Sequence, residues 1–312
     1  MSDYHKPVML QQCLEGLDVR PEGTYVDVTF GGGGHAKEII GRLGEGTLYA
    51  FDQDEDAKAN AKKLSDQLEQ KRSFTFIESN FRYLKRYLKF HGVTQVDGIL
   101  ADLGVSSHQL DEGARGFSTR FDGDLDMRMD QKAEQSAYHV VNEYPEADLV
   151  HLFSAYGEIK NARTLANAII RERTTPITRS AQLKTIAGAV APRGKEMKYL
   201  SQVYQAIRIE VNDEMGALRE FLEQTTEVIR PHGRLVVMSY HSLEDRLVKN
   251  FMNTGNFKGI MEKDFYGHEI RPFKPITKKP VVPELEEIER NKRARSAKLR
   301  VAERIEEKGD RI

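Results

Sequence analysis

Short apolar runs separated by helical patterns dominate the first hundred positions of this chain. Residues 25–29, 73–77 and 96–101 are rich in β-branched or apolar side chains and have the length of buried strands. Another strand is expected to end at Asp52. Because helix-like stretches lie between these runs, the pattern predicts a parallel α/β sheet of the Rossmann-like kind.

The next convincing strand, 234–240, is introduced by a turn at 231–233. It begins roughly 130 residues after the preceding strand ends, whereas a plain α/β fold joins such strands far more directly. The intervening segment has helical periodicity and is punctuated by prolines. Because it would leave the sheet at the carboxyl edge, where open α/β sheets bind ligands, it can form a wall or a lid of the active site. The predicted domains are a sheet domain formed by 1–112 and 206–312, and an inserted, mainly helical domain at 113–205.

A run of four glycines, 31–34, follows the first predicted strand and precedes a helix that opens near His35. Glycines let the backbone turn sharply and lie close against a ligand, and the helix presents free N–H groups there. Asp52 comes nineteen residues after Gly33, at a strand end where a carboxylate can accept hydrogen bonds from ribose. The arrangement predicts an adenosine-type cofactor. It leaves open whether that cofactor is a nicotinamide dinucleotide or S-adenosylmethionine.

Two polar groups follow strands that should end at the same edge of the sheet. Asp102 begins the first group, together with two serines and Gln109. The second group, 239–245, contains His241, a candidate base or orienting group. Asp102 could instead cap the following turn, and a lone histidine is more often structural. Both interpretations stay open at this stage.

Composition narrows the possible binding partners and the cellular location. The 312 residues are 39% hydrophobic, and their net charge of −1 gives no global attraction to a polyanion. A local cluster does exist at 290–300, in an expected charged helical tail, with six basic residues and no acid. A solvated helix face is the alternative. The single cysteine, Cys13, argues against disulfide scaffolds and cysteine metal sites, and neither a signal peptide nor a membrane span is visible, so we expect a cytoplasmic protein.

Ten motifs follow one another along the chain: HKPVML at His5, DVTFGGGGHA at Asp27, FDQD at Phe51, DGILADLGVSSHQLD at Asp97, RGFS at Arg115, LDMRMD at Leu125, YGE at Tyr156, QAIRIEVNDE at Gln205, SYHSLEDR at Ser239 and RARSAKLR at Arg293. In this order they resemble the bacterial ribosomal RNA small-subunit methyltransferase H family over nearly the whole chain. That family methylates N4 of a cytidine in 16S rRNA, using S-adenosylmethionine. Residues 198–202 and the YGEIKN segment depart from the family's pattern.

The resemblance implies a class I S-adenosylmethionine-dependent methyltransferase sheet with an inserted helical domain. It implies a substrate in the decoding region of 16S rRNA in the small ribosomal subunit, and an insertion that helps to hold RNA. It also favours RNA binding by Arg293, Arg295 and Lys298. The implied cofactor contacts are Gly33, Gly34, His35, Asp52, Phe81, Asp102 and Gln109.

The residues themselves also indicate which position of cytosine can be methylated, independently of the resemblance. Methylation at cytosine C5 needs a cysteine nucleophile, and Cys13 lies outside both polar groups. An exocyclic amine needs only hydrogen-bond acceptors and an in-line approach to the methyl group, and no metal. Asp102 or a neighbouring carbonyl is the candidate acceptor, with His241, Asp126 and Asp130 as further candidates nearby. The candidates for stacking on the target base are Phe117, Phe121 and Tyr240.

Two other functions remain open from the sequence. A nicotinamide-dependent oxidoreductase could use the same glycine loop to hold pyrophosphate. A non-catalytic RNA-binding factor in ribosome assembly could retain the cofactor site without its chemistry. The sequence is equally compatible with a monomer and a homodimer.

Overall fold

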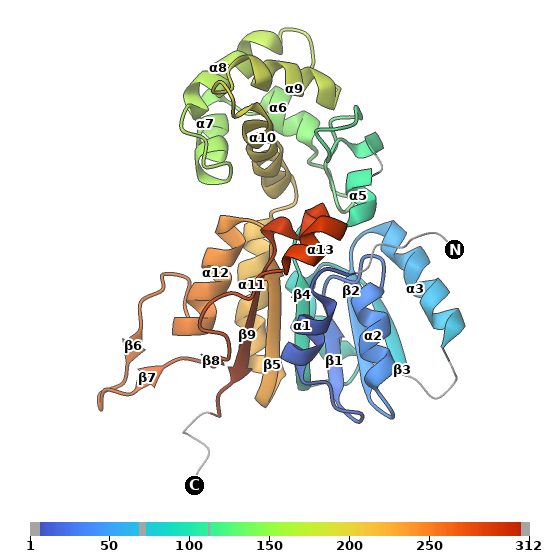
Figure 1. Cartoon of the computed structure of the whole chain (residues 1–312). Coiled ribbons are helices and arrows are strands. Elements are labelled where there is room, and N and C mark those ends of the chain that lie inside the picture. Colours follow the sequence, from blue (N-terminus) through green and yellow to red (C-terminus); the bar gives the residue numbers. More distant parts are fainter. Residues whose placement is uncertain (1–6, 69–72, 112, 307–312) are drawn as a thin grey trace. The chain divides into compact units, whose positions relative to one another are not determined.

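The computed structural model describes residues 7–68, 73–111 and 113–306 of the chain (Figure 1). The start of the HKPVML motif, at His5, lies outside these residues. The chain forms two compact units, and each is described here by itself. The second unit is Val105–Met215, and the first contains the chain on either side of it.

A single seven-stranded sheet organises the first unit, with strand order β3-β2-β1-β4-β5-β9-β8. The five strands from β3 to β5 are parallel, whereas β9 runs antiparallel to both β5 and β8. The order reverses direction between β1 and β4, which is the switch point where open α/β sheets bind ligands. The strands are β1 (Thr24–Asp27), β2 (Thr47–Asp52), β3 (Ser73–Glu78), β4 (Val96–Asp102), β5 (Ile229–Ser239), β8 (Phe273–Pro275) and β9 (Lys298–Arg304).

Helices cover both faces of this sheet, as the apolar character of its strands requires. On one face, α1 (Leu10–Leu17), α2 (Gly34–Arg42) and α3 (Glu55–Gln67) bury apolar side chains against alternate strand residues. Figure 1 shows α11 (Glu214–Val228) and α12 (Ser242–Thr254) on the opposite face. Among the described residues, no helix combines the length and the apolar character that a membrane crossing requires. The remaining elements of this unit are η1 (Phe81–Tyr83), α4 (Leu84–Phe90), β6 (Glu262–Lys263), β7 (Glu269–Ile270), α13 (Leu285–Arg290) and η3 (Lys292–Ser296).

The predicted strand 234–240 begins earlier than expected. Strand β5 already starts at Ile229, and the expected turn is an irregularity inside it, where the pairing with β4 shifts register. His232 takes the left-handed conformation there, with φ 66°. Because Asp97 forms an ion pair with Arg230 at 3.2 Å, both strands stay together across the irregularity.

The prediction of a charged helical tail is wrong for its last part. Residues Lys298–Arg304 form β9, which pairs with β5 along six residues. Arg300 and Arg304 are buried although they carry charge. Arg300 donates from Nε to Asp245 at 2.7 Å, and Arg304 donates to the carbonyl of Thr226 at 3.0 Å. These partners satisfy both guanidinium groups, so the strand can lie within the sheet.

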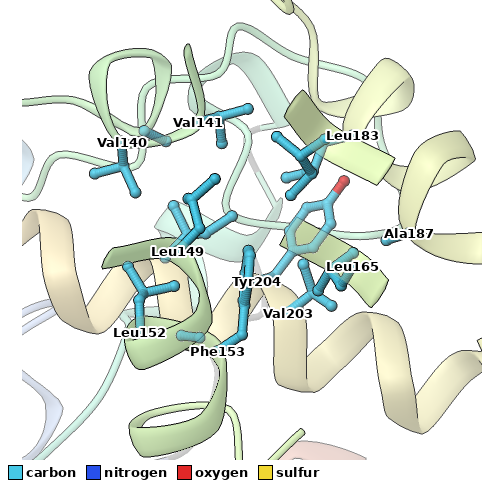
Figure 2. Close-up of a cluster of buried hydrophobic side chains, with 14 of the residues drawn as sticks. Val140, Val141, Leu149, Leu152, Phe153, Leu165, Leu183, Ala187, Val203 and Tyr204 are labelled. Carbon is cyan, nitrogen blue, oxygen red and sulfur yellow. The ribbon is translucent and has the colours of Figure 1, made fainter. Parts of the chain in front are cut away.

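The second unit is helical and has its own hydrophobic core (Figure 2). Side chains such as Leu149, Phe153 and Leu165 are completely buried in it. The unit begins eight residues before the predicted 113–205 and ends ten residues after it. Its last helix explains the later end, because Val203, Tyr204 and Val211 of α10 all pack in this core. The helices are α5 (Ser107–Asp111), η2 (Gly113–Arg115), α6 (Ala137–Glu143), α7 (Glu146–Ala155), α8 (Ala162–Glu172), α9 (Ser180–Ala189) and α10 (Glu196–Val211).

Candidate cofactor and active site

The glycine loop connects β1 to α2 at the switch point of the sheet. Gly33 has φ 75° and forms the N-terminal cap of α2. A Cβ on Gly33 would lie 2.7 Å from the ring of Phe30, and one on Gly34 would lie 2.4 Å from Pro7. No larger residue fits either position without movement. The first backbone N–H groups of α2 have no partner within the helix, so a ligand can accept hydrogen bonds from them.

Asp52 holds this loop in place from the end of β2. Its Oδ2 accepts from the N–H of Gly31 at 2.8 Å, and its Oδ1 accepts from the N–H of Asp54 at 2.9 Å. Burial raises the pKa of Asp52 to about 6, although these N–H groups lower it. Each carboxylate oxygen can accept a second hydrogen bond, so the residue fits the predicted contact with ribose.

An acid within β1, Asp27, was not among the predicted site residues. It is almost completely buried, and burial raises its pKa to about 7. Its Oδ1 accepts from the N–H of Thr29 at 3.1 Å, while Oδ2 is buried and has no hydrogen-bond partner among the described residues. The signal in the sequence was a single acid inside an otherwise apolar strand. Such a buried, unpaired oxygen next to the glycine loop fits a cofactor that carries hydrogen-bond donors.

Asp102 ends β4 beside these groups. Its Oδ1 accepts from the hydroxyl of Tyr240 at 2.8 Å, and its N–H donates to Thr29 Oγ1 at 2.6 Å. Burial raises the pKa of Asp102 to about 7 despite the hydrogen bond from Tyr240. The carboxyl group can therefore be ionised or protonated near neutral pH, and its ionised form can accept a hydrogen bond or a proton.

His35 is the buried second residue of α2. Burial lowers its pKa to about 4, so the imidazole is neutral at physiological pH. Its Nε2 lies 3.1 Å from the carbonyl oxygen of Val8, which can only accept, so Nε2 carries the proton. Nδ1 then carries the lone pair and lies 3.9 Å from Asp102 Oδ2, beyond hydrogen-bond distance. His35 thus orders the start of α2 next to Asp102.

Phe81 lies beyond the end of β3 in η1. Its ring packs edge-on against Phe221, with centroids 5.4 Å apart. Asn80, just before it, donates to the side chain of Gln53 at 2.9 Å and so connects the ends of β3 and β2. Phe81 is therefore an apolar wall at the same sheet edge as Asp52. All the predicted cofactor residues except Gln109 lie at this edge.

Gln109 belongs to the second unit, in α5. Its Oε1 accepts from the N–H of Ser106 at 3.0 Å, and its own N–H donates to Ser106 Oγ at 3.2 Å. These contacts order the turn into α5. The predicted cofactor contact of Gln109 stays a prediction.

His241 is the N-terminal cap of α12. Its Nδ1 accepts from the N–H of Glu244 at 3.4 Å, while Glu244 accepts from the N–H of Tyr240 at 2.9 Å. The two side chains form a reciprocal capping box. The capping gives His241 a structural role in holding Tyr240 near Asp102, and its catalytic role stays a prediction.

The remaining candidates from the sequence lie in the second unit. Phe117 is buried in its core, whereas Phe121 is 50% exposed. Asp126 makes a bidentate ion pair with Arg128, which engages its carboxylate within the unit. Asp130 accepts from the N–H of Lys132 at 2.9 Å.

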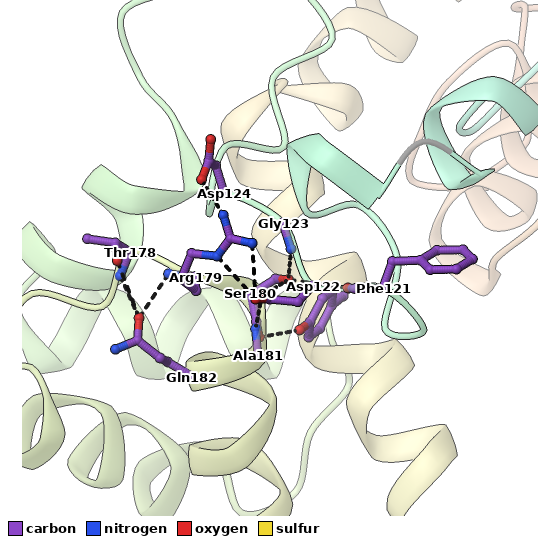
Figure 3. Close-up of polar contacts among 10 residues, drawn as sticks. Phe121, Asp122, Gly123, Asp124, Thr178, Arg179, Ser180, Ala181 and Gln182 are labelled. Atoms are coloured by element: carbon purple, nitrogen blue, oxygen red, sulfur yellow. Dashed lines mark hydrogen bonds and ion pairs between the residues drawn. The ribbon is translucent and has the colours of Figure 1, made fainter.

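The loop that carries Phe121 is tightly held (Figure 3). Arg179 bridges Asp122 and Asp124 at 3.0 and 2.8 Å, and Ser180 Oγ accepts from the N–H of Gly123. In Figure 3 the ring of Phe121 points away from this network. The loop therefore presents an aromatic ring on a rigid support.

The predicted RNA-binding residues have different environments. Arg295 is exposed in η3, and Arg293 is half-buried. Lys298 is the first residue of β9, and its Nζ lies 3.2 Å from Asp245 Oδ2. Asp245 is shared between Lys298 and Arg300, so it offsets the charge of Lys298 only in part.

Residues 2–305 match the model of the MraW methylase family. The chain belongs to this family. Ribosomal RNA small subunit methyltransferase H of Flavobacterium johnsoniae is 58% identical over 97% of this chain and 98% of its own length. The protein with the same name from Cytophaga hutchinsonii is 54% identical over 96% of this chain and 99% of its own length.

Membership of the MraW family decides between the two predicted cofactor classes. The protein is a methylase, and S-adenosylmethionine is its cofactor, as predicted. The first unit is a class I methyltransferase sheet, which confirms the predicted fold class. The unpaired Oδ2 of Asp27, the glycines that leave no room for side chains and the carboxylate of Asp52 all fit this cofactor.

Proposed function

We propose that this chain methylates N4 of a cytidine in the 16S rRNA of the small ribosomal subunit. The observation that carries the proposal is Asp102, a partly buried carboxyl group with a pKa of about 7, held by Tyr240 at the switch point. The names of the MraW-family relatives support the small-subunit substrate. The same proposal implies a cytoplasmic protein, since bacterial ribosomal RNA is found there.

Each residue of the site has a definite task in this proposal. S-adenosylmethionine supplies an electrophilic methyl group when it is bound. Asp52 accepts hydrogen bonds from ribose, while Gly33 and Gly34 let the backbone approach the cofactor. Asp102 accepts a hydrogen bond from the target amine, which keeps the nitrogen lone pair directed at the methyl group. His35 and His241 position these groups from the starts of α2 and α12.

Substrate recognition is proposed for residues of both units. Phe121 is the exposed member of the three stacking candidates, because Phe117 is buried and the Tyr240 hydroxyl is engaged by Asp102. We assign base stacking to Phe121 and cofactor contact to Gln109. Arg293 and Arg295 would contact phosphates.

A direct test compares 16S rRNA from cells with and without this protein. Mass spectrometry of nuclease fragments should find N4-methylcytidine missing from one position when the gene is deleted, and restored by the wild-type chain. A chain with Asp102→Ala should not restore it. Unchanged methylation in the deleted strain would rule out the proposal.

Replacing Cys13 with serine should leave methyl transfer intact. The thiol is completely buried in α1, and burial holds its pKa well above the usual range, so it is not a nucleophile at neutral pH. Single-turnover rates should stay within about twofold of wild type, and thermal unfolding should show only a modest loss of stability. A folded but inactive Cys13→Ser protein would instead indicate C5 chemistry.

Neutralising Arg293 and Arg295 together should weaken RNA binding in a salt-dependent way. If both contact phosphates, the slope of log affinity against log salt should flatten by about 1.4 to 1.8 units. Binding of 16S rRNA at several salt concentrations measures this slope. Lys62→Gln with Lys63→Gln, on the exposed side of α3, is a charge-matched control. Equal slopes in all three proteins would show that the arginines are only a solvated surface.

A further inference from the structure

Between α12 and β8 the chain forms a small hairpin that takes no part in the seven-stranded sheet. Strands β6 and β7 pair only with each other. In Figure 1 this hairpin extends away from the sheet of the first unit. Phe265 at its tip is 97% exposed and Tyr266 is 82% exposed. Such large aromatic side chains contribute almost nothing to the core from this position.

The tip nevertheless has a defined conformation. Asp264 accepts at 2.9 Å from the N–H groups of both Tyr266 and His268, and Gly267 takes φ 84° to close the turn. The rings of Phe265 and Tyr266 lie edge to face, with centroids 5.6 Å apart. The turn therefore holds two aromatic rings in solvent in a fixed arrangement.

The base of the hairpin is anchored to α12. Phe257 stacks on Phe251 with ring centroids 5.3 Å apart. The guanidinium carbon of Arg219 lies over the Phe257 ring, 5.3 Å from its centroid. Asn250 donates to the carbonyl of Phe257 at 3.0 Å, and Asn256 donates to that of Ile260 at 2.7 Å. The exposed rings are thus carried on a support that is fixed at its root.

The charge of this segment differs from that of the whole chain. Residues 258–279 contain six basic and three acidic residues, whereas the whole chain has a net charge of −1. Lys258, Lys263 and Lys274 are all exposed. The hairpin itself, 262–270, has one lysine and three acids, so most of the cations lie on the segments that flank it. Exposed aromatic rings flanked by cations match unpaired nucleic acid, because every base offers a face for stacking and every phosphate a negative charge.

We propose that the β6–β7 hairpin is a second RNA contact, at which Phe265 and Tyr266 stack on unpaired bases of the substrate RNA. The inference rests on the proposed function for its choice of RNA as the partner. The nearby lysines hold the backbone of the same single strand. The hairpin lies in the first unit, so this contact is separate from the recognition assigned above to Phe121.

The test uses the full chain and a short, fluorescently labelled single-stranded RNA, with the same strand in a duplex as comparison. Phe265→Ala with Tyr266→Ala should weaken single-strand binding about tenfold to a hundredfold and leave duplex binding unchanged. Phe265→Trp with Tyr266→Trp should retain binding, since tryptophan also stacks. Phe90→Ala is the matched control, because Phe90 is also 82% exposed in this unit.

Several outcomes would overturn the inference. These are single-strand affinity of the alanine pair within about twofold of wild type, equal losses on both RNAs, or no binding of single strands by the wild type. Sedimentation that shows a dimer lost only in the alanine pair would identify a second copy of the chain as the partner. Affinity for S-adenosylhomocysteine should be unchanged throughout, which verifies the fold.

Methyl transfer to 16S rRNA separates this inference from the proposed function. If the wild type does not form N4-methylcytidine, the proposed function fails, while the comparison of single-strand affinities still tests the hairpin. If the wild type methylates and the alanine pair matches it in kcat/KM and in RNA affinity, only the hairpin inference fails.

Discussion

Methyl transfer by an Asp102→Ala variant should fall by about a hundredfold or more, which is the scale of losing a positioned acceptor for a reacting group. Asp102→Asn should keep part of the rate, because an amide oxygen still accepts a hydrogen bond but carries no charge. Single-turnover rates at saturating cofactor measure the effect. If both variants transfer methyl groups like wild type, Asp102 only caps the turn after β4.

The pH dependence should identify the same group. The pKa of Asp102 is raised to about 7, so the wild-type rate should rise as pH increases through neutrality, and the asparagine variant should lack this limb. Tyr240→Phe removes a hydrogen bond that lowers the pKa of Asp102, so the limb should move to higher pH. A profile unaffected by either change would contradict this assignment.

As pH rises, the contribution of Asp102 to folding stability should fall while the methyl-transfer rate rises. A carboxyl group whose pKa is higher in the folded protein stabilises the fold most below its unfolded pKa, and this contribution is lost as pH rises through about 7. Asp102→Asn cannot ionise, so the cofactor-free variant should unfold at a higher temperature than wild type above neutral pH. Thermal unfolding at several pH values tests this, and a destabilised variant would show that the ionised carboxylate supports the fold.

Asp52→Ala should weaken cofactor affinity roughly tenfold to a hundredfold, the range expected for loss of charge-assisted hydrogen bonds. The same change also removes the acceptors for the N–H groups of Gly31 and Asp54. Asp52→Asn should lose less, because it keeps one oxygen. Calorimetry with S-adenosylhomocysteine measures the affinities. The control is Asp66→Ala, because Asp66 is an exposed acid of α3. An unchanged affinity for Asp52→Ala would eliminate the contact with ribose.

The part of the fold nearest the cofactor could be predicted because its signals are local. Four glycines, an apolar strand before them and an acid at the end of the next strand each lie within a few residues of the structure they specify. Parallel strands also bring their carboxyl ends to one edge, so Asp52 and Asp102 could be placed together without knowledge of other contacts.

Features that depend on distant partners were missed. The strand β9 contains buried Arg300 and Arg304, whose partners lie 55 and 78 residues away, so its sequence looks like a solvated helix. The hydrogen bond between Tyr240 and Asp102 spans 138 residues. Asp27 was not recognised as a site residue because its raised pKa comes from burial, which the strand sequence alone does not report.

The position of β9 has a consequence for how this protein is made. The strand lies between β5 and β8, and Leu299, Val301 and Ala302 are buried on it, yet it is among the last described segments of the chain to be synthesised. During translation β5 therefore has an open edge until residues 298–304 have left the ribosome. The helical unit, whose residues are contiguous, can fold earlier. A nascent chain would thus complete its methyltransferase sheet only after both the helical unit and β5 have been synthesised.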